Sequence, residues 1–222
     1  MEEQIINMPA VALRGLTILP GMIAHFDVSR ERSLRAVEEA MEQDQKIYLV
    51  TQRNVDSEDP TQEDLYQMGI VADIKQVVRL QNDVVRILVD GISRAALLGF
   101  TGNEKYLEAE ICYCDSNADS LPEDLREAML LGVREAFHRY AAVVGKISKE
   151  LIRQIDQYED LEKLIDYVTN NLPVSYELKQ QVLEAEDIND RYQVIVSLLL
   201  SQVEVISIKN ELQKKVKVRV DK

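Results

Sequence analysis

Residues 9–115 alternate between apolar and polar positions, or carry short apolar runs, in the way that is typical of β-strands. Turn-forming residues such as Gln81-Asn82-Asp83 and Gly102-Asn103 separate these runs. The predicted strands are Ala10–Arg14, Met22–Val28, Lys46–Gln52, Ile70–Leu80, Val84–Asp90, Ile92–Phe100 and Tyr106–Asp115. Because these strands follow one another closely, the pattern predicts an antiparallel sheet or barrel in a β-rich lobe over residues 1–115.

One helix is expected to interrupt this lobe. Ser29 can cap a segment in which apolar residues recur at helical spacing and glutamates take the opposite face. The apolar positions are Leu34, Val37 and Met41, and the glutamates are Glu38, Glu39 and Glu42.

The hydrophobic period changes after residue 115. Residues 116–120 (SNADS) predict a polar linker, and Ser120 with Glu123 fits a capping box that opens a helix. Apolar residues then follow near one helical face: Leu125, Met129, Val133, Phe137 and Tyr140. A helical lobe is therefore expected over residues 121–208.

Further helices are expected to begin at Ser148 and Ser175, with an amphipathic stripe over 161–168 that Pro173 brings to an end. The last helix, from about Asp187, is the longest, and residues 194–200 are apolar nearly all round, which predicts burial among other helices. Residues 209–222 form a polar, basic end with six basic and two acidic residues, a net charge of 6 − 2 = +4. The fold class predicted is α+β, with a β-rich lobe followed by a helical bundle and a long C-terminal helix.

Composition places the chain among soluble folded proteins. Of its 222 residues, 46% are hydrophobic and 29% are charged, which excludes a wholly disordered chain. No uninterrupted apolar run approaches the ~20 residues that cross a bilayer, and Met1–Asn7 is acidic and polar where a signal peptide is basic and then apolar. We therefore expect a cytoplasmic protein without a membrane partner. The net charge of −13 argues against a nucleic-acid partner, because an acidic body repels phosphates.

The sequence contains no recognisable catalytic signature. Gly145-Lys146 resembles the end of a P-loop, but Tyr140 and Ile147 stand where that motif needs Gly and Ser or Thr. Gly91-Ile92-Ser93-Arg94-Ala95 lacks the last glycine of a nucleophile elbow and lies between predicted strands, so we interpret it as a bend in the sheet. The two histidines, His25 and His138, are 113 positions apart and lack partners at metal-ligand spacing.

The two cysteines, Cys112 and Cys114, alternate with apolar residues on a predicted strand, which favours free thiols over a metal or redox pair. No cofactor or metal is therefore expected in this chain.

Four segments of the β-rich lobe, at residues 9–21, 30–41, 60–74 and 84–95, resemble the amino-terminal domain of the Lon family of ATP-dependent proteases. Residues 171–183 and the long helix over 187–212 resemble the segment leading to that family's ATPase module. Order, spacing and approximate lengths agree over nearly all 222 residues. Gly15 departs from the family, which usually has an acidic residue after the arginine.

The resemblance implies a PUA-like β-rich pseudo-barrel followed by a helical bundle, and a role in capturing unfolded or tagged substrates and in assembling a hexamer. It implies that the P-loop and the Ser-Lys dyad of the parent protease, which uses ATP and Mg²⁺ on misfolded and short-lived regulatory proteins, lie downstream. The chain itself is then non-catalytic, and 209–222 leads to the ATPase module. The alternative is a stand-alone protein-binding module of the same fold, without ATPase or protease.

The candidate substrate-contact residues surround the turn at Pro20-Gly21, which is expected to reach the surface. They are Leu16, Ile18, Leu19, Met22 and Ile23, of which most are expected to be core residues and one or two exposed. Met22 is the first candidate because methionine adapts to different partners.

The candidate self-association residues are Val203 and Ile206, which lie beyond the most apolar part of the last helix. An apolar stripe at that position needs a partner, so the chain is expected to form a dimer on its own; the alternative is that the stripe is buried within the monomer. A hexamer of the parent is implied by the family resemblance.

Overall fold

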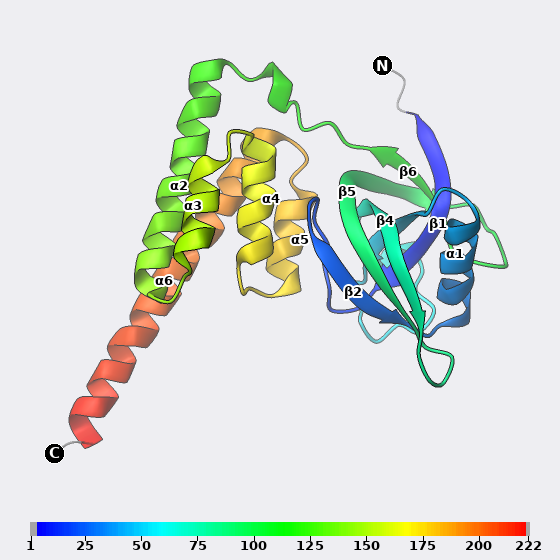
Figure 1. Ribbon diagram of the computed structural model, residues 1–222, viewed down its shortest axis with the longest axis horizontal. Coiled ribbons are helices and arrows are strands. Elements are labelled where there is room, and N and C mark those ends of the chain that lie inside the picture. The colour runs from blue at the N-terminus through cyan, green and yellow to red at the C-terminus, as the bar shows by residue number, and fades with distance from the viewer. Residues whose placement is uncertain (1–3, 221–222) are drawn as a thin grey trace. The chain divides into compact units, whose positions relative to one another are not determined.

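The computed structural model describes residues 4–220, with side-chain positions up to residue 216. The chain divides into two compact units (Figure 1). The first contains residues up to Asp115 together with Pro173–Glu186, and the second contains Ser116–Leu172 and the chain from Asp187 onward. The predicted α+β fold class is confirmed, with a sheet of six strands and a long C-terminal helix.

The strands of the first unit are β1 (Ile5–Leu13), β2 (Ile23–Val28), β3 (Lys46–Thr51), β4 (Met68–Arg79), β5 (Val85–Phe100) and β6 (Glu108–Tyr113). They lie in the order β2-β5-β4-β3-β1-β6, and a further pairing of β5 with β6 closes the last five into a barrel. All pairs are antiparallel except β1 with β3.

The long strand β5 pairs with β4 along one edge and with two different strands along the other edge. Its first half, Val85–Asp90, pairs with β2, and its second half, Ala95–Phe100, pairs with β6. Two separate strands were expected here, with a bend at Gly91, but one strand runs through this glycine. As a result β2 lies at the edge of the sheet, with β5 as its single neighbour among the described strands.

Alternate residues of the strands supply two apolar clusters, one on each face of the sheet. The helix α1 (Glu31–Glu42) covers the first, with Ala36, Val37 and Ala40 packed in it (Figure 1). The other contains Tyr48, whose hydroxyl donates to the carbonyl of Ala95 at 3.0 Å.

A helix distant in sequence, α5 (Tyr176–Glu184), belongs to the first unit. The Gln180 amide donates to the Met68 carbonyl at 3.0 Å, and its oxygen accepts from the hydroxyl of Thr17 at 3.0 Å. The expected helical lobe over 121–208 is therefore divided, because these bonds join Pro173–Glu186 to the sheet. Sequence periodicity identifies this helix but not the unit against which it packs.

The second unit consists of α2 (Glu123–Val144), α3 (Lys149–Gln157), α4 (Leu161–Asn171) and α6 (Ile188–Val220). Its core includes residues of the predicted stripes, such as Val133, Phe137, Leu164 and Leu199. The buried guanidinium of Arg191 on α6 donates to Glu162 on α4 at 3.0 Å. The expected basic segment 209–222 is helical to Val220, and its last two residues lie outside the described chain.

The helix ends agree with the predicted caps at some positions and differ at others. Ser148 caps α3 by accepting from the N–H of Leu151 at 3.1 Å. The predicted cap of Ser29 is wrong, since Arg30 is the N-cap of α1 and provides no side-chain cap. The predicted capping box of Ser120 with Glu123 is also wrong, because the Ser120 hydroxyl donates to the carbonyl of Asn117 in a short 3₁₀ turn.

The stretch Ile188–Val216 of α6 is long and apolar enough, by length and composition, to cross a membrane. The sequence predicts no uninterrupted apolar run of that length. Charged residues such as Arg191 and Glu204 do interrupt the stretch Ile188–Val216. Core helices of soluble proteins meet the same criteria, and Ile195 and Leu199 of α6 are buried. The absence of a membrane partner stays a prediction.

Candidate functional site

The segment between β1 and β2 contains a tight turn, and its backbone requires glycine at two positions. Gly15 has a φ of 64° and Gly21 a φ of 73°, in the left-handed region that glycine adopts without strain. The N–H of Met22 donates to the carbonyl of Leu19 at 3.1 Å, which closes the turn around Pro20 and Gly21. Gly15, the departure from the family pattern, thus fits a conformation that an acidic side chain would strain.

The turn separates the candidate contact residues into three groups. Ile18 and Leu19 have exposed fractions of 1% and 0%, so they cannot contact a substrate at the surface. Leu16 and Met22 are half-buried and pack against the apolar cluster beneath α1. Ile23 is 68% exposed. The first candidate therefore changes from Met22, which serves mainly as packing, to Ile23, the first residue of β2.

The edge strand β2 also carries backbone groups that have no strand partner among residues 4–220. The N–H of Gly91 donates to the carbonyl of Met22 at 2.9 Å, so Met22 and every second residue after it turn their backbone groups toward β5. By this alternation, the N–H and C=O groups of Ile23, His25 and Asp27 turn away from β5. The side chains of the same three residues are exposed.

Near the end of β2, Asp27 forms a bidentate ion pair with Arg86 of β5, with N···O distances of 2.7 and 3.0 Å. The hydrogen bond from Arg86 is the main cause that lowers the pKa of the Asp27 carboxyl. The charge of Asp27 is therefore balanced within the sheet.

Beside this pair, a hollow of about 160 Å³ opens between the end of β1, β2 and the start of α1. Leu13, Phe26 and Val28 supply part of its apolar lining, and Arg14 and Arg30 supply positive charge. Composition and periodicity do not reveal this hollow, since its lining comes from three elements.

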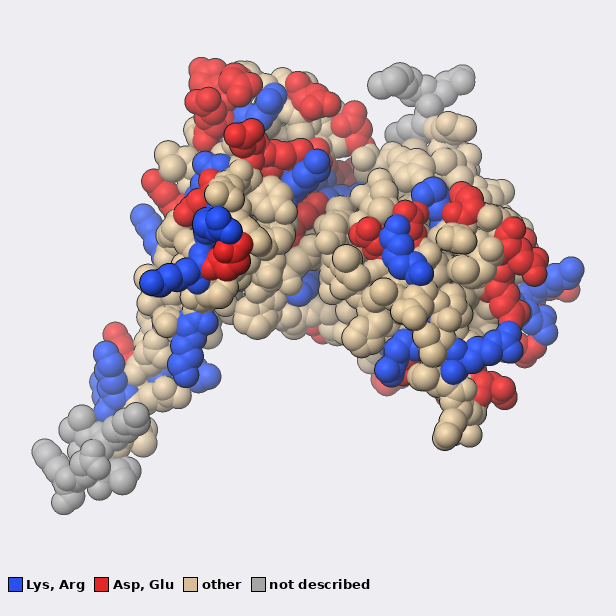
Figure 2. Space-filling view, viewed as in Figure 1, with Lys and Arg blue, Asp and Glu red and all other residues tan. Residues whose placement is uncertain are grey.

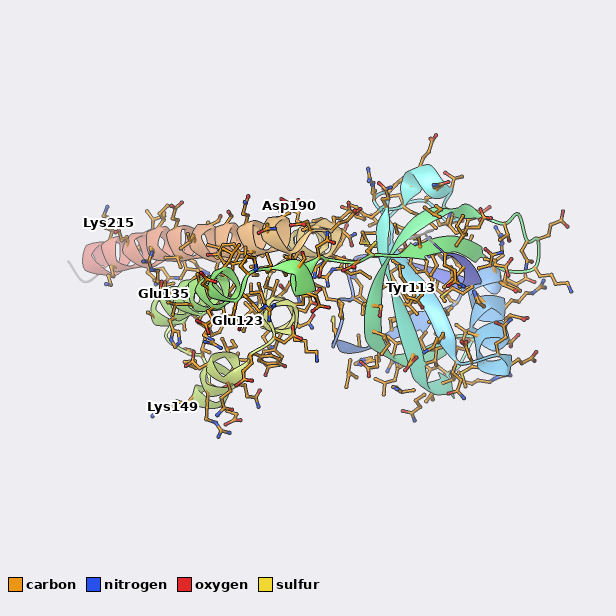
Figure 3. All side chains as sticks on the ribbon, turned by 90° about the horizontal axis from the view of Figure 1, so that it is seen from above. Tyr113, Glu123, Glu135, Lys149, Asp190 and Lys215 are labelled. Atoms are coloured by element: carbon orange, nitrogen blue, oxygen red, sulfur yellow. The ribbon has the colours of Figure 1, made fainter. Side chains whose placement is uncertain are left out.

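A second exposed surface lies on the part of α6 that extends beyond the other helices of its unit, where Figure 3 labels Lys215. The predicted residues Val203 and Ile206 are only half-exposed. The strongly exposed apolar residues form a neighbouring stripe: Val205, Ile208, Leu212 and Val216. Spacings of three and four residues give the signal for this stripe, which continues into the basic segment that was expected to be only polar.

Basic side chains flank this distal stripe of α6, as Figure 2 shows in blue along the described distal part of the helix. Lys209, Lys214 and Lys215 are all exposed. The distal part of α6 thus combines an apolar stripe with positive charge.

Residues 7–201 match the protein family described as the ATP-dependent protease La (LON) substrate-binding domain. The chain belongs to this family. The family resemblance inferred from sequence is therefore confirmed, and the match covers the turn, the edge strand β2 and most of the helical unit.

Several bacterial Lon proteases align with this chain over its whole length or nearly so. The Lon protease of Lachnoclostridium phytofermentans is 38% identical over 222 residues, which is 100% of this chain and 27% of the relative. That of Clostridioides difficile is 34% identical over 97% of this chain and 28% of the relative. The chain therefore spans little more than a quarter of the length of these relatives.

Solved structures of Lon N-terminal domains share the fold. The N-terminal domain of Lon protease from the Mycobacterium avium complex superposes with a TM-score of 0.71 at 18% identity, covering 87% of this chain and 98% of that one. The domain from Xanthomonas campestris superposes with a TM-score of 0.58 at 14% identity, covering 86% and 98%. At these identities the likeness establishes the fold of the LON domain alone.

The side chains of the LON domain offer little reactive chemistry. Cys112 and Cys114 are free thiols, as expected, and burial raises the pKa of Cys114. The residues that the structure describes contain no cluster of three or more metal-ligating side chains. The exposed β2 edge and the distal stripe of α6 are candidate binding surfaces because both present exposed apolar side chains.

Proposed function

We propose that this LON domain holds unfolded segments of protein substrates in extended form along the outer edge of β2, for a Lon-like ATP-dependent serine protease. The observation that carries the proposal is the exposed Ile23 on a strand with one neighbour. An extended chain can pair with the backbone groups at Ile23, His25 and Asp27 as an added strand. The apolar side chain of Ile23 supplies contact area beside this ladder.

Backbone pairing explains how such a surface accepts many substrates. Every polypeptide presents the same N–H and C=O groups, so recognition depends on an unfolded, extended state more than on sequence. A short ladder and one exposed aliphatic side chain give a dissociation constant on the order of 1–100 μM for a single domain. Several domains in one oligomer strengthen binding by avidity.

The proposal is tested by titrating a fluorescently labelled, reduced and carboxymethylated protein against wild type and Ile23→Asp. The substitution places a charge beside the β2 edge and is expected to weaken binding about tenfold. Leu98→Asp is the matched control, since Leu98 is 44% exposed on the half of β5 that pairs with β6. Equal affinity of Ile23→Asp and wild type, with native circular dichroism, would contradict the proposal.

ATP hydrolysis and peptide cleavage are proposed to belong to other parts of a longer, cytoplasmic Lon-like protein that uses ATP and Mg²⁺. The support is that neither a P-loop nor a nucleophile elbow is complete in this sequence. The purified chain should therefore turn over neither ATP nor a casein substrate. Activity that persists through further purification would contradict this assignment.

Oligomer assembly is proposed to use the distal stripe of α6, paired with a second copy of this chain. Val205, Ile208 and Leu212 are spaced by three and four residues, as at the contact positions of a two-helix seam. Each is more than half exposed. A dimer of the isolated chain and a hexamer of the longer protein are the states proposed.

A further inference from the structure

The hollow beside β2 combines two features that seldom occur together on a surface. Part of its wall consists of apolar residues that continue into the core, including Leu13, Phe26 and Val28. Two guanidinium groups, of Arg14 and Arg30, line the same space. A ligand that fills the hollow thus needs both an apolar group and a negative charge.

Neither guanidinium has an ion pair with a carboxylate among residues 4–216. Arg14 donates to the carbonyl of Ser57 at 3.0 Å. Arg30 donates to the Ala12 carbonyl at 2.9 Å and to Oε1 of Gln52 at 2.8 Å. All of these acceptors are neutral, so neither arginine is neutralised by direct contact with a carboxylate, and only the more distant charge of Asp59 acts on Arg30. Asp27 also lines the hollow, but Arg86 balances its charge.

The electrostatics of Arg30 indicate the same preference. Burial, and then the nearby positive charge of Arg14, lower the pKa of the Arg30 guanidinium, and the carboxylate of Asp59 offsets only part of this effect. A carboxylate placed between the two arginines would relieve their repulsion and add charge-assisted hydrogen bonds.

The start of α1 adds donors to the same space. The first intrahelical bond runs from the N–H of Leu34 to the carbonyl of Arg30, and no side chain caps the helix. The N–H groups of its first turn therefore lack intrahelical partners and favour an anion. Ser33 lines the hollow with an exposed fraction of only 8%, and its hydroxyl makes no hydrogen bond to the described residues.

We propose that this hollow binds the C-terminal residue of an extended polypeptide, with its apolar side chain against Leu13, Phe26 and Val28 and its α-carboxylate facing Arg14 and the start of α1. A C-terminal apolar residue is the simplest peptide unit that carries both required groups. The inference rests on the proposed function and deepens it, because the residues before the C-terminus would follow the outer edge of β2. The four steps from Asp27 back to Ile23 span roughly 13 Å at about 3.3 Å per residue.

The test compares two labelled peptides of about six residues that end in Val-Leu, one with a free carboxylate and one amidated. Each is titrated against wild type, Arg14→Gln and Arg35→Gln. Arg35 is the matched control, an exposed arginine of α1 that does not line the hollow. Wild type and Arg35→Gln should bind the free acid about tenfold more tightly than the amide, and Arg14→Gln should lose most of this preference.

Two results would overturn the inference. Equal affinity of wild type for the acid and the amide would exclude a carboxylate site. If Arg14→Gln and Arg35→Gln reduce the preference for the free acid over the amide by the same factor, the carboxylate site lies outside the hollow.

The carboxymethylated protein, titrated in parallel, separates this inference from the proposed function. If it binds through the Ile23 edge while the acid and amide peptides bind equally, the proposed function stands and only the C-terminal site fails. If neither peptide nor the unfolded protein binds, both proposals fail.

Discussion

The backbone N–H of Gly91 donates a hydrogen bond of 2.9 Å to the carbonyl oxygen of Met22. The carbonyl of Gly91 in turn accepts from the N–H of Gly21 at 2.8 Å, so the turn before β2 is fixed to the middle of β5. A Cβ at position 91 would lie 2.4 Å from the carbonyl oxygen of Leu19. The position of Ile23 at the start of the edge strand therefore depends on a glycine in the neighbouring strand.

Gly91→Ala is expected to destabilise the domain by about 1–3 kcal/mol, because the backbone at Leu19 must move to admit the methyl group. Gly99→Ala is the control on the same strand, where the nearest atom to a Cβ is a carboxylate oxygen of Glu110 at 3.4 Å. The measurement is the free energy of unfolding in urea. If both variants lose the same free energy of unfolding, the close approach of Gly91 to the Leu19 carbonyl does not account for the loss of stability.

Gln180→Ala should weaken the attachment of α5 to the sheet. The substitution leaves the buried hydroxyl of Thr17 without this acceptor and the carbonyl of Met68 without this donor, at a cost of about 1–3 kcal/mol. Gln181→Ala, at the exposed neighbouring position of the same helix, is expected to change stability by less than about 0.5 kcal/mol. Urea unfolding of both variants checks the prediction, and similar losses would refute it.

The ion pair of Lys46 with Asp73, at 2.8 Å across β3 and β4, predicts a pH dependence of stability. The hydrogen bond from Lys46 lowers the pKa of the Asp73 carboxyl from its ordinary 3.8. Since the folded-state pKa is depressed, the pair stabilises the fold above pH 3.8, and this contribution is lost as the pH falls through the lower folded-state pKa.

Asp73→Asn should therefore lower the free energy of unfolding at neutral pH by up to about 1 kcal/mol, and the difference from wild type should shrink in acid. Asp83→Asn is the control, because Asp83 is exposed and has no ion pair among the described residues. A difference for Asp73→Asn that stays constant down to acidic pH would contradict the assignment.

Ile208→Asp combined with Leu212→Asp should abolish dimer formation, since both charges would lie within the apolar stripe of α6. Glu211→Ala, at an exposed polar position between them, should leave the dimer intact. Sedimentation velocity at several concentrations distinguishes these outcomes. If wild type is a monomer at ~100 μM, or if the double variant remains a dimer, the stripe is not the contact.

Hydrophobic periodicity was sufficient to predict the α+β class and most elements, because strands and helices bury residues at different spacings. Periodicity could not assign α5 to the first unit, which contains the sheet. That placement depends on side-chain hydrogen bonds of Gln180 to residues more than 100 positions away. Periodicity also divided β5 at Gly91, where the glycine admits the backbone of Leu19 and the strand continues.

The candidate site was predicted in part. The sequence located the turn and named Ile23, but it ranked Met22 first, because apolar residues in a turn do not reveal which side chain faces the core. The hollow with Arg14 and Arg30 was missed, since its lining residues come together only after β1, β2 and α1 have packed. On α6, the sequence predicts contact at Val203 and Ile206, whereas the exposed stripe lies on a neighbouring face of the helix.

The most direct test of strand addition at β2 is amide hydrogen exchange by NMR, with and without the carboxymethylated protein. The amides of Ile23, His25 and Asp27 turn away from β5 and should exchange readily in the free domain, whereas those of Ala24 and Phe26 should already be protected. Binding is expected to slow exchange at Ile23, His25 and Asp27 selectively. Unchanged exchange at these three amides, when the unfolded protein is bound, would contradict the account.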